Sequence, residues 1–190
     1  MTYNLIFPEI YFKYENENHQ DSKNYIINEL VEKNNFSVNK DWNCNSKTFH
    51  IQNNLSIQFI SSALDKFSKE NKKNSQLFVN ESWINLYDRG SFQEVHSHPL
   101  SQFVLVYFVQ YQKDTDAKFY FYNSNDKILE TTGVRNFYSD DINSRVAGRC
   151  NYPDIEEGDI IIFPGYLDHG VSPHNSDSKR ITLSCNFNFS

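Results

Sequence analysis

The spacing of apolar residues changes from a helical to a strand period near residue 77, and this change constrains the fold most strongly. In the first part of the chain apolar side chains recur every three or four positions, as in Leu55, Phe59 and Phe67. From Leu77 onward β-branched and aromatic residues dominate, and the period falls to two. Helices followed by strands favour a mainly β (α+β) fold, a β-sandwich or jelly roll with N-terminal helices packed on its outer face.

The second half of the chain contains segments with the alternation that is typical of strands. The last of them alternates most clearly: Ile181, Leu183, Cys185 and Phe187 form one face, and Arg180, Thr182, Ser184 and Asn186 form the other. Residues 124–157 have no sustained period, so we expect an extra hairpin or a functional loop there. The predicted strands are 77–87, 92–97, 102–111, 117–123, 158–163, 169–173 and 179–188.

Length and composition exclude several classes of protein. A chain of 190 residues suits a single domain, with a helical part at 1–75 and a jelly-roll core at 76–190. The longest apolar runs, such as Phe103 to Val109, are too short to cross a bilayer, and no basic-then-apolar leader opens the chain. The net charge of −6 argues against a non-specific nucleic-acid binder. The three cysteines are scattered, so we expect neither a disulfide framework nor a zinc knuckle, and a reducing, cytoplasmic setting fits best.

Three histidines occur where they could form a metal site. His96 and His98 end a predicted strand, and residues two apart in a strand project from the same face, so both imidazoles could share one metal ion. His169 follows the turn after Phe163-Pro164, at the mouth of the expected barrel, where a third ligand can approach. The alternative for the His-x-His pair is two surface histidines, or one surface and one core histidine.

Arg180 opens the polar face of the last strand, which also carries Thr182 and Ser184. A guanidinium offers a bidentate fork to a carboxylate, and a neighbouring hydroxyl adds a further donor. The alternative is an arginine on a solvent-facing strand. The remaining histidines (His19, His50 and His174) are interpreted as surface or solvated residues, and the tryptophans (Trp42 and Trp83) as packing residues.

The order of these motifs resembles that of the 2-oxoglutarate/Fe(II)-dependent oxygenases, and most of all a bacterial and phage branch related to prolyl hydroxylases. The resemblance extends over nearly the whole chain. It rests on Ser82-Trp83-Ile84-Asn85, His96-x-His98-Pro99, Gly158-Asp159 with Phe163-Pro164, His169, and Arg180-Ile181-Thr182-Leu183-Ser184-Cys185-Asn186. It implies a double-stranded β-helix, a distorted and cupin-like jelly roll, in agreement with the strand pattern.

The resemblance also implies roles for individual residues. His96 and His169 match the two iron-binding histidines, and Arg180, assisted by Thr182, matches the residue that pairs with the distal carboxylate of 2-oxoglutarate. Tyr107 is expected to donate its hydroxyl to the same carboxylate, although Tyr87 and Tyr111 have comparable claims.

The sequence departs from the family pattern at the third iron ligand. Most of the superfamily has Asp or Glu two residues after the first histidine, whereas this chain has His98, which we predict to be a ligand. Asp168 is expected to hold a ligand imidazole in place without itself binding the metal.

The leading hypothesis is an enzyme that uses Fe(II), 2-oxoglutarate and O2 to hydroxylate an unactivated C–H bond. The resemblance suggests a prolyl or other peptidyl substrate, without fixing it. One alternative is a non-catalytic jelly-roll module that binds a metal or a ligand. Another is a three-histidine, cupin-type dioxygenase that uses no 2-oxoglutarate. A homodimer is compatible with all three hypotheses.

Overall fold

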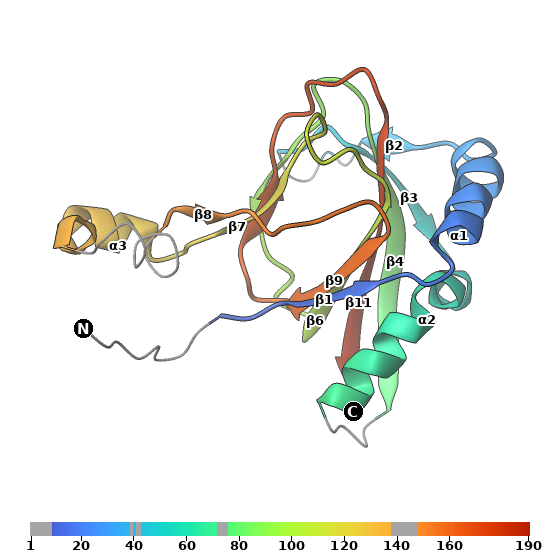
Figure 1. The fold of residues 1–190 in the computed structure, drawn as a ribbon, viewed down its shortest axis with the longest axis horizontal. Helices are drawn as coiled ribbons and strands as arrows, with labels where there is room; N and C mark the ends of the chain where they lie inside the picture. The colour runs from blue at the N-terminus through green and yellow to red at the C-terminus, as the bar shows by residue number, and fades with distance from the viewer. Residues whose placement is uncertain (1–8, 39, 41–42, 72–75, 138–147) are drawn as a thin grey trace.

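A computed structural model describes residues 9–38, 40, 43–71, 76–137 and 148–190 (Figure 1). Trp42 lies outside these residues. Two antiparallel sheets form the centre of the molecule. The larger sheet has the order β1-β9-β6-β11-β4-β3-β2, and the smaller has the order β5-β10-β7-β8. The bounds in the larger sheet are β1 Phe12–Glu15, β2 Ser37–Val38, β3 Lys47–Ile51, β4 Leu77–Tyr87, β6 Phe103–Gln110, β9 Asp159–Pro164 and β11 Arg180–Phe189. Those in the smaller sheet are β5 Gln93–His96, β7 Phe119–Tyr122, β8 Cys150–Asn151 and β10 His169–Val171.

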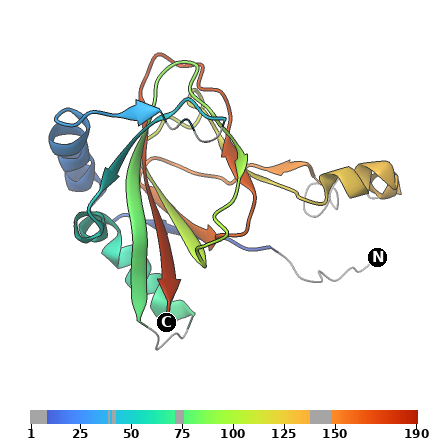
Figure 2. The same cartoon turned by 180° about the vertical axis from the view of Figure 1, so that it is seen from behind.

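Helices cover the outer face of the larger sheet, as the sequence predicted. α1 (His19–Tyr25) continues as a π-helix over Ile26–Val31, and α2 (Asn53–Glu70) follows β3. Figures 1 and 2 show α1 and α2 together on one side of the sheets. The apolar face of α2, which includes Phe59, Ile60 and Phe67, packs on the apolar face of β11. All four apolar residues predicted for that face of β11 are buried in this core.

A second apolar core fills the space between the two sheets. Val104, Val106 and Phe108 of β6 contribute to it, together with Phe119 of β7 and Phe163 of β9. The intervening residues of β6 point into the helix-covered core, so β6 is buried on both faces, as its continuous apolar run predicted. Two sheets packed face to face, with helices outside, confirm the jelly-roll prediction.

The seven predicted strands are all present, and the described residues contain four short strands that the sequence did not predict. β1, β2 and β3 lie in the part of the chain predicted to be helical, and β8 lies in the segment without a period. That segment also contains α3 (Asp126–Thr131) and a 3₁₀ helix at Val134–Phe137, and α3 projects away from the sheets (Figure 2). β8 pairs with β7, so the described part of the segment extends the smaller sheet. In the described part of the chain, no helix has the length and apolar character needed to span a membrane.

Candidate metal centre and adjoining cavity

Three histidines from one edge of the smaller sheet converge. His96 ends β5 and His169 begins β10, and the two residues are directly opposite each other in the ladder. The ring centroids of His96 and His169 are 4.4 Å apart, and His98 lies 5.2 Å from the first ring and 5.3 Å from the second. One nitrogen from each ring lies within 4.8 Å of the others. Three imidazoles at this separation can share one metal ion of the kind that nitrogen ligands prefer.

A glycine brings the third histidine to the other two. The backbone N–H of His98 donates to the carbonyl of Gly165 at 2.7 Å, which ties the turn after β5 to the turn after β9. A Cβ at Gly165 would collide with the backbone oxygens of Ser101 and His98. Any larger residue at this position would therefore push the His98 loop away from the centre.

Hydrogen bonds to the backbone orient two of the three rings. Nδ1 of His96 lies 2.8 Å from the carbonyl oxygen of Glu94, and Nδ1 of His169 lies 2.8 Å from that of Leu167. Because a carbonyl can only accept, each ring carries its proton on Nδ1, and its lone pair lies on Nε2.

Burial keeps the three imidazoles neutral. It lowers the pKa of His96, lowers the pKa of His98 to about 4, and places the pKa of His169 well below its usual value. Where His96 is protonated, its charge opposes protonation of His98 and His169, which contributes to their low pKa values. Neutral imidazole is the form that binds metals, so the chemistry of this donor set fits a divalent cation such as Fe(II).

A cavity of about 420 Å³ adjoins the three histidines. Its floor is the polar face of β11, and the sheet register places a residue of β4 beside each residue of that face. Arg180 pairs with Tyr87, Thr182 with Asn85, and Ser184 with Trp83. Thr48 and His50 of β3 extend the second and third of these rows.

Arg180 lies at the inner end of the cavity, and its buried charge requires an anionic partner. The residue Arg180 is 1% exposed, and its guanidinium carbon lies 4.4 Å from the centroid of the Tyr87 ring. Within the described residues, its buried Nε and Nη1 atoms have no hydrogen-bond partner. A buried guanidinium with unused donors is unfavourable unless a ligand pairs with it, and a carboxylate fits its planar fork. Arg180 therefore lies in the cavity as a buried residue, not on a solvent-facing strand.

The structure also places Thr182 in the cavity, next to Arg180, and shows the residues that hold it. Asn85 Nδ2 donates to Thr182 Oγ1 at 3.3 Å and to Ser184 Oγ at 3.1 Å. Gln93 Nε2 in turn donates to Asn85 Oδ1 at 3.3 Å and to Ser46 Oγ at 3.0 Å. This buried amide network was not predicted, because the sequence alone does not show which residues of β4 and β11 pair with each other.

Tyr107 does not reach the cavity, which contradicts the role predicted for it. Its direct partner on β11 is Leu183, so its side chain lies on the helix-covered face of the sheet. There its hydroxyl lies 2.8 Å from Nδ1 of His19, and burial raises the pKa of Tyr107. Tyr87, one of the two alternatives, is the tyrosine that lines the cavity.

Asp168 does not hold a ligand imidazole in the way that was predicted. Its carboxylate accepts a hydrogen bond from Ser124 Oγ at 2.8 Å, and backbone carbonyls occupy Nδ1 of His96 and His169. Its charge still acts on His96, because it partly opposes the burial that lowers the pKa of His96.

His50 is exposed, as expected for a surface residue, whereas His19, His174 and Trp83 differ from expectation. His50 and Trp83 line the outer end of the cavity, where the Trp83 ring stacks on His98 with centroids 5.9 Å apart. His19 is half-buried against Tyr107. His174 is fully buried rather than solvated.

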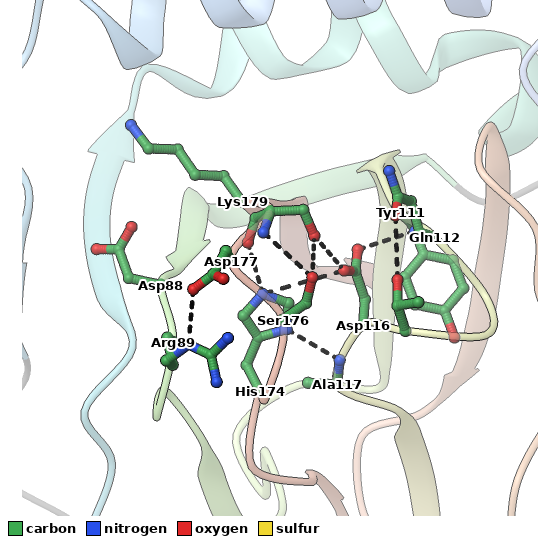
Figure 3. Close-up of polar contacts among 12 residues, drawn as sticks. Asp88, Arg89, Tyr111, Gln112, Asp116, Ala117, His174, Ser176, Asp177 and Lys179 are labelled. Carbon is green, nitrogen blue, oxygen red and sulfur yellow. Dashed lines mark hydrogen bonds and ion pairs between the residues drawn. The ribbon is translucent and has the colours of Figure 1, made fainter.

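His174 belongs to a separate polar cluster with Asp116 (Figure 3). Ser178 joins the cluster through a hydrogen bond to Asp116. Its Nδ1 accepts from the backbone N–H of Ala117 at 3.0 Å, and its Nε2 donates to the backbone carbonyl of Ser178 at 2.7 Å. The Ser178 hydroxyl donates to Asp116 and not to His174. Both ring nitrogens are therefore used in joining two loops, and the cluster is not a nucleophilic triad.

Comparison with known proteins identifies the family. The model of the family described as "Putative 2OG-Fe(II) oxygenase" matches residues 81–186, more than half of the chain. No curated protein matches in sequence.

The fold resembles that of several solved oxygenases. HygX from Streptomyces hygroscopicus, solved with nickel and 2-oxoglutarate bound, has a TM-score of 0.64 at 12% identity, over 95% of this chain and 83% of HygX. A Pseudomonas putida prolyl-4-hydroxylase has a TM-score of 0.63 at 10% identity, over 95% and 92%. The viral collagen prolyl hydroxylase of Paramecium Bursaria Chlorella virus-1 has a TM-score of 0.61 at 11% identity, over 93% and 94%. The matched region contains the three histidines and the buried arginine, and this chain belongs to the 2OG-Fe(II) oxygenase family.

Proposed function

We propose that His96, His98 and His169 hold the Fe(II) of this oxygenase and that Arg180, with Thr182, binds the distal carboxylate of 2-oxoglutarate. The observation that carries the proposal is Arg180, which lines the same cavity as the three imidazoles and whose buried Nε and Nη1 atoms have no partner in the described part of the chain. A dicarboxylate with one end at Arg180 and the other at the metal would satisfy both requirements.

The chain's own residues bind and orient the cosubstrate. Arg180 supplies the positive charge, and the Tyr87 ring beneath it fixes the plane of the guanidinium. The Asn85 amide fixes the hydroxyl of Thr182, which then needs no rearrangement to meet a carboxylate. When bound, Fe(II) would supply the reaction of O2 with 2-oxoglutarate that yields succinate, CO2 and the oxidant for hydroxylation.

The outer end of the cavity is the side from which a substrate would approach. Its residues are half-buried or exposed, in contrast to the fully buried residues at the Arg180 end. They include the aromatic rings of His50 and Trp83 and the carboxylates of Glu81 and Glu94. We propose that the enzyme hydroxylates a C–H bond of a peptidyl residue. Proline is the first residue to test, because two proteins with this fold are prolyl hydroxylases.

An anaerobic titration of Fe(II)-loaded protein with 2-oxoglutarate tests the proposal. We expect a saturable visible metal-to-ligand charge-transfer band that Arg180→Ala shifts to much higher 2-oxoglutarate concentration without loss of bound iron. Metal binding and O2 consumption without the band or succinate would instead favour a three-histidine dioxygenase that uses no 2-oxoglutarate. A chain that binds no iron would be a non-catalytic jelly-roll module.

We also propose that the chain acts as a single domain, 1–190, in a reducing, cytoplasmic setting, with a homodimer as the assembly to test first. The larger sheet contains strands from both the N-terminal part and the C-terminal part, which supports one folding unit. Cys150 and Cys185 are free thiols, which suits a reducing compartment.

A further inference from the structure

The hydrogen bond at Nδ1 distinguishes His98 from the other two histidines. His96 and His169 meet backbone carbonyls, whereas Nδ1 of His98 lies 3.2 Å from Nδ2 of Asn186. An amide nitrogen can only donate, so Nδ1 of His98 accepts. A neutral His98 then carries its proton on Nε2, the opposite tautomer from the other two rings.

Glu81 determines which end of the Asn186 amide faces His98. Asn186 and Glu81 are direct partners across β11 and β4, and Asn186 Nδ2 donates to Glu81 Oε1 at 2.7 Å. If the amide were turned over, its Oδ1 would face the Glu81 carboxylate, and two acceptors would meet without a proton between them. The carboxylate therefore selects the orientation that presents N–H to His98.

This orientation leaves one polar atom unsatisfied. Asn186 is 3% exposed, and its Oδ1 has no hydrogen-bond partner within the described residues. A buried acceptor without a donor is unfavourable, so Glu81 holds the amide in an orientation that carries a cost. The free energy needed to turn the amide against Glu81 would have to come from ligation of a bound ion by His98.

We propose that Asn186 is a positioning residue for His98 and that Glu81 makes His98 the adjustable member of the three-histidine set. With Nδ2 held by Glu81, His98 presents an N–H toward the centre. His98 becomes an Nε2 ligand when the amide turns and offers Oδ1 to an Nδ1–H. The inference rests on the metal centre proposed above, and it concerns where a neutral ring carries its one proton.

The metal-free protein gives the first test, independent of activity. In ¹⁵N-histidine NMR spectra we expect Nδ1–H signals for His96 and His169 and an Nε2–H signal for His98. With Zn(II) as a diamagnetic probe, His98 should change to Nδ1–H. An Nδ1–H signal for His98 before metal is added would overturn the proposal, whereas failure to bind any metal would overturn the proposed centre and leave the tautomer result intact.

Glu81→Gln gives the second test. A glutamine can donate or accept and so follows either orientation of Asn186, which removes the bias against ligation by His98. We expect Co(II) to bind about tenfold more tightly, a change typical of residues that orient metal ligands. Glu94→Gln is the matched control, because Glu94 also lines the cavity and loses the same charge, but its side chain accepts from the backbone N–H of Asn43 instead. Equal changes in Co(II) affinity in both variants would show that the effect comes only from the lost negative charge, and would overturn the proposal.

Asn186→Leu serves as a second variant of similar volume that removes both polar contacts. Its melting temperature and circular dichroism establish that it is folded. We expect the His98 signal to lose its preference for Nε2–H. A His98 tautomer and a Co(II) affinity identical to those of the wild type would show that Asn186 does not position the ring.

Discussion

The guanidinium of Arg180 lies over the ring of Tyr87, with 4.4 Å between its central carbon and the ring centroid. The ring stabilises the cation from one side, and within the described residues the Nε and Nη1 donors have no partner, so they remain for a ligand. Burial raises the pKa of the Tyr87 hydroxyl, although the charge of Arg180 partly opposes that rise. Tyr87 therefore remains a neutral support beneath Arg180.

Replacing Arg180 should separate cosubstrate binding from metal binding. We expect Arg180→Met to weaken 2-oxoglutarate by roughly 30-fold or more, because a buried charge pair contributes about 2 kcal/mol or more. Without 2-oxoglutarate the variant should be more stable than the wild type by about 1–4 kcal/mol, since it no longer buries an unpaired cation. Titration calorimetry and urea unfolding measure the two effects. Arg89→Ala, which removes an exposed arginine paired with Asp177, is the control.

Tyr87 and Tyr107 give a direct contrast between the two faces of the larger sheet. Tyr87→Phe should weaken the binding of 2-oxoglutarate by about fivefold to tenfold, because the Tyr87 hydroxyl could no longer form a hydrogen bond with the carboxylate at Arg180. Tyr107→Phe should leave cosubstrate affinity unchanged and lower the free energy of unfolding by about 1 kcal/mol through loss of its contact with His19. Weaker cosubstrate binding in Tyr107→Phe alone would restore the role first predicted for it.

The misassignment of Tyr107 has a physical cause. β6 is apolar on both faces, so its residue pattern does not show which side chains face the helices and which face the smaller sheet. Only the register, which pairs Tyr107 with Leu183, determines this. By contrast, β11 alternates between apolar and polar residues, and its sequence alone placed Arg180 and Thr182 on one face, the face that lines the cavity.

The same reasoning explains which parts of the fold were predicted. Strands in the second half have a clear period of two or a long apolar run. β1 and β3 have one buried residue each, and they exist because they pair with β9 and β4. The His-x-His spacing identified two of the three imidazoles that converge in the structure. The partners Asn85, Gln93 and Asn186 depend on contacts distant in sequence, which spacing does not show.

Substitution of His98 tests whether it is a ligand. We expect His98→Asp to retain metal, because a carboxylate completes the two-histidine, one-carboxylate set that Fe(II) accepts. His98→Ala should bind metal about 10-fold to 100-fold more weakly, and His169→Ala should bind it more weakly still, since His169 is more deeply buried between its partners. Co(II) titration followed by absorbance measures all three. If neither His98 variant changes the affinity, His98 is not a ligand.

The low pKa values of the three imidazoles predict how stability depends on pH without metal. Unfolded histidine binds a proton below about pH 6.5, whereas folded His98 remains neutral down to its pKa of about 4. The unfolded chain therefore binds more protons between these values, and stability falls as pH decreases from 6.5 to 4. His98 alone contributes at most about 3 kcal/mol to this loss. Urea unfolding at several pH values should show a shallower decline for His98→Asn, and an equal decline in both proteins would contradict the low pKa.

His174 should be required for stability and not for metal binding. It is fully buried, and its two ring nitrogens join the backbone of Ala117 to that of Ser178 (Figure 3). His174→Ala leaves a buried N–H and a buried carbonyl without partners, so we expect the free energy of unfolding to fall by about 2–4 kcal/mol. Asn175→Ala, at the exposed neighbouring position, is the control and should change stability by less than about 0.5 kcal/mol. Folded His174→Ala should still bind Co(II) with wild-type affinity, because His174 is not one of the three converging histidines and does not line the cavity. A loss of Co(II) affinity in the folded variant would show that the loops it joins also support the metal centre.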